Sequence, residues 1–138
     1  MKLNNFTIIN LLNVLNNYSN SKLPQKISFA ITKNLMILNK EYQTYEEHLK
    51  KVIANYNEYI EADENGNITL GVNGLPKIND ATQEYHFNED INELLLIELD
   101  VDLYQIDEEV FNYDDSDKYS SLTPTEIMQL QSILCNKE

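Results

Sequence analysis

The sequence contains no arginine, and its ten lysines stand against 23 aspartates and glutamates, which gives a formal net charge of −13. Without arginine the chain has no guanidinium group for bidentate recognition of phosphate or carboxylate, and it cannot supply an arginine finger. Binding to nucleic acid or to an anionic membrane depends on clustered basic side chains. The charge balance therefore predicts that neither nucleic acid nor a membrane is a direct partner.

Cysteine and glycine are also scarce. The single cysteine, Cys135, excludes an intramolecular disulfide framework and a multi-cysteine zinc site, and it fits a reducing cytoplasm. Three isolated glycines exclude a glycine-rich phosphate loop. The N-terminal apolar run is interrupted by Asn10 and Asn13, so it is too short and too polar for a signal peptide or a membrane span. We therefore expect a cytoplasmic protein.

What the chain does contain is enough apolar material for a core and a strongly uneven charge. Hydrophobic residues make up 42% of its 138 residues, which favours one folded domain over residues 1–138. Residues 1–57 carry a net charge of +4, whereas residues 58–138 carry −17. The expected organisation is a helical, near-neutral to basic part over residues 1–62 and a mixed α/β, strongly acidic part over residues 63–138.

Apolar residues recur at helical spacing in four segments. The first covers residues 5–18, and the second begins at Pro24 and meets no glycine or proline before Gly66, so a long helix of about 38 residues is predicted. A third helix opens at residues 79–80, and the last follows Thr123-x-x-Glu126, which has the form of a capping box. The long helix has an apolar seam at alternating spacings of four and three: Ile31, Leu35, Leu38, Tyr42, Tyr45, Leu49, Val52, Tyr56 and Tyr59.

That seam has two implications. A helix of this length would reach about 57 Å, so it bends, overhangs or pairs with another copy, and a homodimer through the long helix is one possibility. Four of the nine seam residues are tyrosines, whose hydroxyls favour a wet or hydrogen-bonded end. We therefore expect a partly exposed or groove-forming seam.

Two β elements are predicted between and after these helices. Residues 68–72, the turn Asn73-Gly74 and a return containing Pro76 indicate a β-hairpin at a sheet edge. From Ile97 to Leu103 apolar residues alternate with acidic ones, which is the period-two pattern of a half-buried strand with an acidic face, and the predicted strand runs on to Ile106. The predicted fold class is α+β: mainly helical, with one long helix, a short helix pair, a β-hairpin and one acidic-faced strand.

No motif indicates catalysis. The segment from Asp63 to Gly74 lacks the glycine and glutamate positions of a calcium-binding EF-hand loop. The carboxylates around Asp100 and Asp102 leave a metal-dependent enzyme as an alternative, but no lysine accompanies them and they alternate along a strand. His48 and His86 have no companion at metal-binding spacing. We therefore predict a non-enzyme with no catalytic residues, no metal site and no cofactor.

The acidic segment is the candidate partner-binding surface. Fourteen carboxylates and no lysine lie between Lys77 and Lys118, so the segment is not neutralised by local ion pairs. Such a surface can simply keep a protein soluble, but here it is interleaved with aromatic residues, which often anchor interfaces. The predicted contact residues are Glu98, Asp100, Asp102, Tyr104, Asp107, Glu108, Glu109, Phe111, Tyr113, Asp114, Asp115 and Asp117.

The order of segments resembles that of small phage and prophage proteins from low-GC Gram-positive bacteria. The resemblance rests on five segments spread over nearly the whole chain, each structural in kind: residues 22–35, Tyr45-Glu46-Glu47, residues 63–67, residues 98–102 and residues 122–126. It implies a phage protein acting in the cytoplasm of a bacterial host. Phage proteins of this size and acidity include anti-CRISPR-like inhibitors that mimic nucleic acid, assembly factors and minor virion components.

Three hypotheses follow. The leading one is a non-enzymatic inhibitor of host defence that binds a basic, nucleic-acid-handling protein through the acidic segment by nucleic-acid mimicry. The second is a phage structural or assembly factor that makes contact through the apolar seam of the long helix. The third is the carboxylate metal-dependent enzyme.

Overall fold

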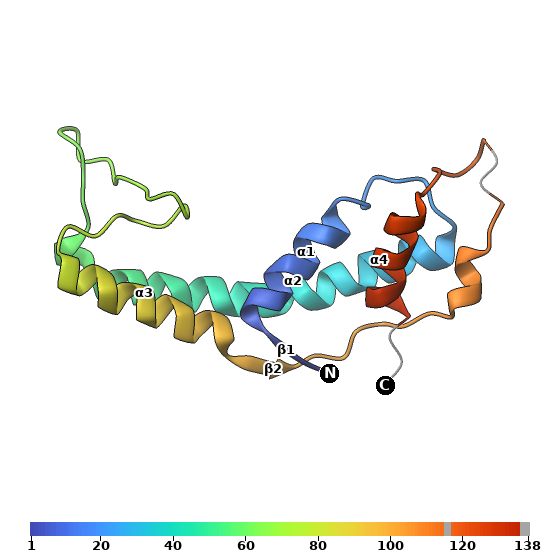
Figure 1. Ribbon diagram of the computed structural model, residues 1–138, viewed down its shortest axis with the longest axis horizontal. Coiled ribbons are helices and arrows are strands. Elements are labelled where there is room, and N and C mark those ends of the chain that lie inside the picture. The colour runs from blue at the N-terminus through green and yellow to red at the C-terminus, as the bar shows by residue number, and fades with distance from the viewer. Residues whose placement is uncertain (115–116, 136–138) are drawn as a thin grey trace. The chain divides into compact units, whose positions relative to one another are not determined.

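The computed structural model describes residues 1–114 and 117–135. Most of them are helical, and two short strands form an antiparallel pair (Figure 1). This architecture confirms the predicted α+β class. The elements in chain order are β1 (Lys2–Asn4), α1 (Asn5–Asn16), α2 (Gln25–Ala54), a 3₁₀ helix (Asn57–Tyr59), α3 (Ala81–Leu96), β2 (Glu98–Asp100), a 3₁₀ helix (Glu108–Phe111) and α4 (Pro124–Leu134).

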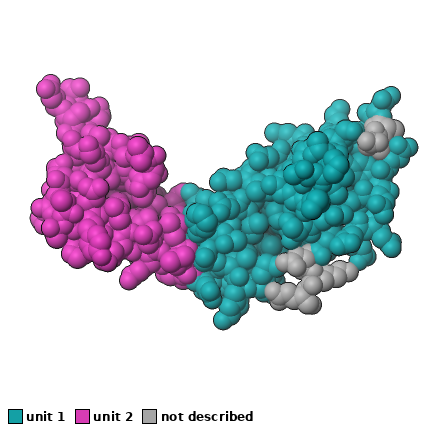
Figure 2. Space-filling model, in the orientation of Figure 1, with its two compact units in different colours: residues 1–42, 98–138 teal, residues 43–97 magenta. Residues whose placement is uncertain are grey.

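The chain divides into two compact units (Figure 2). Unit 1 comprises Met1–Tyr42 and Glu98–Glu138, and unit 2 comprises Gln43–Ile97. The division does not follow the predicted boundary at residue 62, because α2 contributes residues to both units. The basic N-terminal segment therefore shares unit 1 with the acidic segment, and the sequence charges come to −5 for unit 1 and −8 for unit 2. The single domain over residues 1–138 stays a prediction.

Unit 1 is built on α1, the first part of α2, and α4. The side chain of Asn4 accepts a hydrogen bond from the backbone N–H of Thr7, which caps α1. At the start of α4, Thr123 and Glu126 form the predicted capping box, with both reciprocal hydrogen bonds present. The core of unit 1 contains residues from every one of its helices, among them Ile8, Leu12, Leu15, Ile27, Ile31, Leu38, Leu130 and Leu134.

Unit 2 packs α3 against the last part of α2. Asp80 caps α3 by accepting hydrogen bonds from the backbone N–H groups of Thr82 and Gln83. The buried side chains of unit 2 come from both helices and the loop between them: Val52, Tyr56, Ile78, Phe87, Ile91 and Leu94. Within this core the Tyr56 ring meets the Phe87 ring edge-on, with 5.2 Å between centroids.

The long helix is shorter than predicted, and its seam is used inside the chain. It ends at Ala54 after 30 residues because Asn55 and Asn57 are weak helix formers, and a 3₁₀ helix begins at Asn57. Leu38, Val52 and Tyr56 are buried within the chain's own units. These buried positions leave less of the seam for a partner, and the contact or homodimer through the long helix stays a prediction.

The β elements are also shorter than predicted. Only Glu98–Asp100 of the predicted strand forms β2, because its partner β1 has just three residues before α1 begins at Asn5. In the predicted hairpin the chain does reverse at Gly74, which has a φ of 77°, and Leu70 forms a bridge with Pro76. The remaining pairing there consists of isolated bridges rather than regular strands.

The segment from Asp63 to Asn67 forms a turn. One carboxylate oxygen of Asp63 accepts hydrogen bonds from the backbone N–H groups of Asn65 and Asn67, each at 2.9 Å. Gly66 has a φ of 81°, a conformation that glycine adopts without strain. Across the described residues, no helix combines the length and the apolar character needed to cross a membrane.

Candidate functional site

The carboxylates among the predicted contact residues are exposed in unit 1 wherever the structure describes them. We define the acidic row as its described carboxylates, and every member is solvent-exposed: Glu98, Asp100, Asp102, Asp107, Glu108, Glu109, Asp114 and Asp117. Asp115, which the sequence also nominated, lies outside the described residues. In residues 1–114 and 117–135, the members other than Asp107 form no ion pair with a lysine or histidine.

The first part of the acidic row is held by strand pairing. β1 and β2 run antiparallel, with Lys2 opposite Asp100 and Asn4 opposite Glu98. The backbone N–H of Val101 then donates to the carbonyl of Met1 at 2.9 Å, and the Val101 side chain is buried in the core of unit 1. The alternation predicted from the sequence is therefore present here, with carboxylates outward on either side of a buried valine.

A buried asparagine fixes the next stretch. Asn34 of α2 is fully buried, and its side-chain amide bonds both backbone groups of Tyr104: the Tyr104 N–H donates at 2.6 Å, and the Tyr104 carbonyl accepts at 2.9 Å. Two residues on, the N–H of Ile106 donates to the carbonyl of Leu134 at 2.8 Å. The amide of Asn34 and the carbonyl of Leu134 thus make the hydrogen bonds that a neighbouring strand would otherwise make. Asp102 remains exposed to water.

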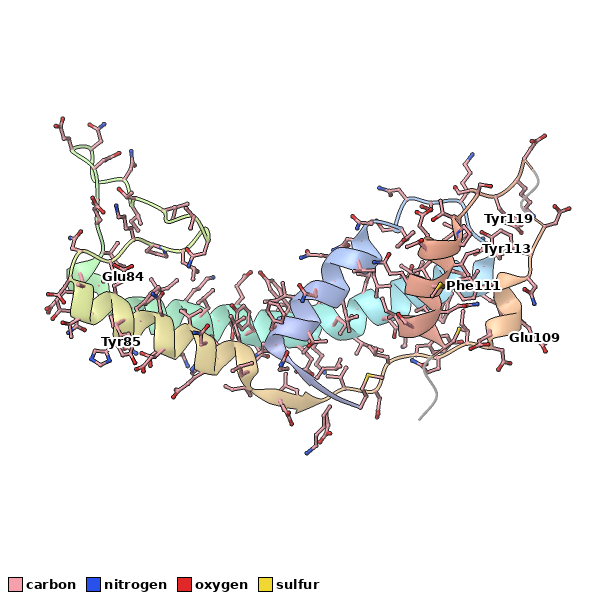
Figure 3. The ribbon with its side chains drawn as sticks, viewed as in Figure 1. Glu84, Tyr85, Glu109, Phe111, Tyr113 and Tyr119 are labelled. Atoms are coloured by element: carbon pink, nitrogen blue, oxygen red, sulfur yellow. The ribbon has the colours of Figure 1, made fainter. Side chains whose placement is uncertain are left out.

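The predicted aromatic contact residues divide into different roles. Phe111 is only 6% exposed and belongs to the core of unit 1, where it anchors the 3₁₀ helix that carries Glu108 and Glu109 (Figure 3). It is therefore dropped as a contact residue, since a buried ring cannot reach a partner. Tyr104 is 40% exposed, and its ring meets the ring of Phe29 edge-on at 5.5 Å.

The third aromatic residue, Tyr113, closes the end of the acidic row. Its hydroxyl donates to the carbonyl of Ser120 at 3.2 Å, and its ring meets the Tyr119 ring edge-on at 5.5 Å (Figure 3). The backbone of Ser120 in turn donates to the carbonyl of Lys22 at 2.6 Å. Tyr113 is half-buried, so its main role is to tie this loop to the segment before α2.

Two tyrosines that join helices have raised pKa values. In unit 2, the hydroxyl of Tyr56 donates to the carboxylate of Asp90 at 2.5 Å, and this hydrogen bond, with burial and the negative charges of Asp90 and Glu89, raises the pKa of Tyr56 to about 12. In unit 1, burial and the charge of Glu126 raise the pKa of Tyr18, whose hydroxyl donates to Gln129. Both tyrosines hold helices together.

The acidic row does not converge on one point. Within residues 1–114 and 117–135, no three histidine, cysteine, aspartate or glutamate side chains are grouped so that they could share a metal ion. The carboxylates follow an extended backbone and then a 3₁₀ turn, so they form a line of separate negative charges. Such a line can attract and orient a positively charged surface.

A set of basic residues was missed by the sequence reasoning. Lys26, Lys33 and Lys40 lie seven residues apart on the exposed face of α2, with two large apolar side chains, Phe29 and Met36, between them. The sequence signal for this set is that the five residues follow one another at spacings of three and four, on the side of the helix opposite the apolar seam. It was overlooked because the lysines were counted only toward the net charge of the N-terminal half.

Comparisons with known proteins give this chain no relatives: no family model, no curated protein and no solved structure matches it.

Proposed function

We propose that this protein is a non-enzymatic binding protein that inhibits a basic, nucleic-acid-handling host protein, in the manner of an anti-CRISPR that mimics nucleic acid. The single observation that supports the proposal is the acidic row, in which exposed carboxylates stand on a backbone fixed to the core of unit 1 and, apart from Asp107, form no ion pair within the described residues. A fixed line of like charges costs free energy through self-repulsion, and a cationic partner would relieve that cost.

The geometry suits a partner that normally holds a nucleic-acid backbone. Alternate residues of an extended segment lie about 6.7 Å apart, so Glu98, Asp100 and Asp102 form a regular series of negative charges on one side. Because the backbone is held by strand pairing and by Asn34, little conformational entropy would be lost when these side chains meet lysines and arginines. Charge complementarity of this kind mainly speeds association and selects partners.

The test is a triple charge reversal in the part of the acidic row that makes no strand pairs. The variant Asp102→Lys, Glu108→Lys, Glu109→Lys changes the charge by the same amount as a control variant, Glu46→Lys, Glu47→Lys, Glu58→Lys, whose positions are also exposed. Tagged forms of the protein and of both variants are used to capture proteins from a Gram-positive host lysate at low and high salt. Each captured protein is then assayed for nucleic-acid binding with and without the tagged chain.

The expected result is that wild type and the control capture a nucleic-acid-binding protein and displace its nucleic acid, while the triple reversal weakens this by about 100-fold or more. High salt should release the complex. The proposal fails if the triple reversal binds as well as wild type, or if the captured protein keeps its nucleic acid. Circular dichroism of each variant checks that it is folded.

A further inference from the structure

The exposed face of α2 in unit 1 carries an ordered alternation of charge and apolar surface. Lys26, Phe29, Lys33, Met36 and Lys40, here called the lysine stripe, follow one another at spacings of three and four. At 3.6 residues per turn, all five lie within an arc of about 80° on the helix. Phe29 is 56% exposed and Met36 is 67% exposed, and in the described residues none of the three lysines forms an ion pair.

A complementary alternation lies on α3 in unit 2. Tyr85, Glu89, Asn92 and Leu96 share one side of that helix with Glu93 beside them, and we call these five residues the glutamate stripe. Tyr85 is 62% exposed and projects from the helix (Figure 3), and Leu96 is 64% exposed. The opposite side of α3 is the one that packs into the core of unit 2, so the glutamate stripe is left on the surface.

The carboxylate at the centre of the glutamate stripe is oriented by its neighbours. Glu89 lies 3.6 Å from Nδ1 of His86, and the Tyr85 hydroxyl forms a hydrogen bond with it that raises the pKa of Tyr85. Glu93, four residues on, is exposed and forms no ion pair within the described residues. Two acidic groups are therefore presented between two large apolar side chains.

We propose that the lysine stripe of one copy of this chain docks on the glutamate stripe of a second copy. The charges are opposite, and each stripe has two large apolar side chains to bury. The lysine stripe spans about 21 Å of helix and the glutamate stripe about 17 Å. With the centres aligned, Lys33 faces Glu89 and Glu93, and Tyr85 and Leu96 fall just outside Phe29 and Met36, where the lysine stems cover them.

A second copy offers this face both opposite charge and apolar surface. The net charge of −13 opposes association with a second copy at longer range, as it would with a nucleic acid or an anionic membrane, so the local match of the two stripes has to supply the attraction. A phosphate backbone would pair with the lysines but offers nothing apolar for Phe29 and Met36 to bury. Because one helix-on-helix contact buries little surface, the association should be weak and concentration-dependent. The proposal uses no residue of the acidic row and stands independently of the proposed function.

Paired charge reversals test the contact. Variant A carries Lys33→Glu and Lys40→Glu, variant B carries Glu89→Lys and Glu93→Lys, and a control carries Lys50→Glu and Lys51→Glu on the exposed face of α2 in unit 2. In variant A both stripes are acidic and in variant B both are basic, so neither should self-associate. A mixture of A and B restores two complementary contacts. Sedimentation velocity from about 10 µM to about 1 mM covers the range in which weak complexes form.

Wild type and the control should associate as concentration rises, each of A and B alone should be at least about tenfold weaker, and the equimolar mixture should recover association. A wild type that stays monomeric at the highest concentration overturns the proposal, as does a mixture that behaves like its components. Binding of wild type to phosphatidylglycerol vesicles or to an oligonucleotide, lost in variant A, would also overturn it by giving the lysine stripe another ligand.

Discussion

At the scale of single residues, Asn34 decides where the acidic segment lies. It follows Ile27 and Ile31 and precedes Leu38 at spacings of four, three and four, so it occupies a core position of α2 that would ordinarily be apolar. Its amide is fully buried, and its hydrogen bonds in the part of the chain that the structure describes go to the backbone of Tyr104. A buried amide that makes its hydrogen bonds stabilises the fold, whereas the N–H and carbonyl of Tyr104 would destabilise it if they were buried without a partner.

Replacing Asn34 by alanine should therefore cost about 2–4 kcal/mol of unfolding free energy, because the N–H and carbonyl of Tyr104 lose their partners and a small cavity forms. Urea unfolding followed by circular dichroism measures the change. Asn39→Ala, at an exposed position of the same helix, is the matched control and should alter the free energy by less than about 0.5 kcal/mol. Equal effects of the two variants would contradict the role given to Asn34.

The raised pKa of Tyr56 predicts how the stability of the protein changes with pH. Its pKa in the folded protein is about 12 against 10.0 for an ordinary tyrosine, so the folded state holds this proton more tightly than the unfolded state. The stabilisation is complete below pH 10 and is lost as the pH rises toward 12. Tyr56→Phe should lower the unfolding free energy by about 1–3 kcal/mol at pH 8.

Measured between pH 8 and pH 12, the difference in stability between wild type and Tyr56→Phe should shrink as the pH passes about 10. Thermal unfolding at each pH gives this difference directly, and Tyr104→Phe, at an exposed position, serves as the control. A gap between wild type and Tyr56→Phe that stays constant over this range would show that the hydrogen bond to Asp90 does not set the pKa.

At the scale of elements, the capping box at the start of α4 stabilises a helix that packs against residues far away in the sequence. The capping box of Thr123 and Glu126 fixes the first turn of a helix of only 11 residues, whose inner face fills the core of unit 1. Thr123→Ala should destabilise the protein by about 1 kcal/mol. Thr125→Ala, two residues on and exposed, is the control. Differential scanning calorimetry compares them, and a control as destabilised as the cap variant would argue against the capping role.

The elements that could be predicted are those with local causes. The starts of α1, α3 and α4 follow from their cap residues Asn4, Asp80 and Thr123, and the turn at Gly74 follows from its dipeptide. The pairing of β1 with β2 could not be predicted, because the two partners are more than 90 residues apart and β1 has only three residues.

The candidate site divides in the same way. The exposure of the carboxylates and the burial of Val101 followed from the alternating pattern. The burial of Phe111 did not, because a phenylalanine between acidic residues has the same local sequence whether it faces a core or a partner. Asn34 had a signal in its core-face spacing, but an apolar neighbour, Leu35, was assigned to the seam in its place.

At the scale of the whole molecule, charge opposes folding. Both units carry net negative charge, and few of the described carboxylates are paired. Raising the salt concentration from about 10 mM to about 150 mM shortens the screening length to about 8 Å and should stabilise the protein by about 1 kcal/mol. Thermal unfolding over this range tests the expectation, and a melting temperature that falls with salt would contradict it.

A matched variant assigns part of this effect to the acidic row. Asp102→Asn, Glu108→Gln and Glu109→Gln remove three charges with little change in shape. The variant should melt above wild type at low salt and respond less to added salt. If it responds as wild type does, the repulsion lies mainly in unit 2.

The division of unit 1 into two stretches of chain also bears on the order of folding during synthesis. Unit 2 is continuous in sequence, from Gln43 to Ile97, whereas the core of unit 1 needs Leu130 and Leu134 beside Ile27 and Leu38. A ribosome therefore delivers all of unit 2 before unit 1 can close. Until α4 emerges, the apolar residues of α1 and the first part of α2 are not covered by α4. The core of unit 1 is therefore completed only when the last segment to be synthesised packs against the first.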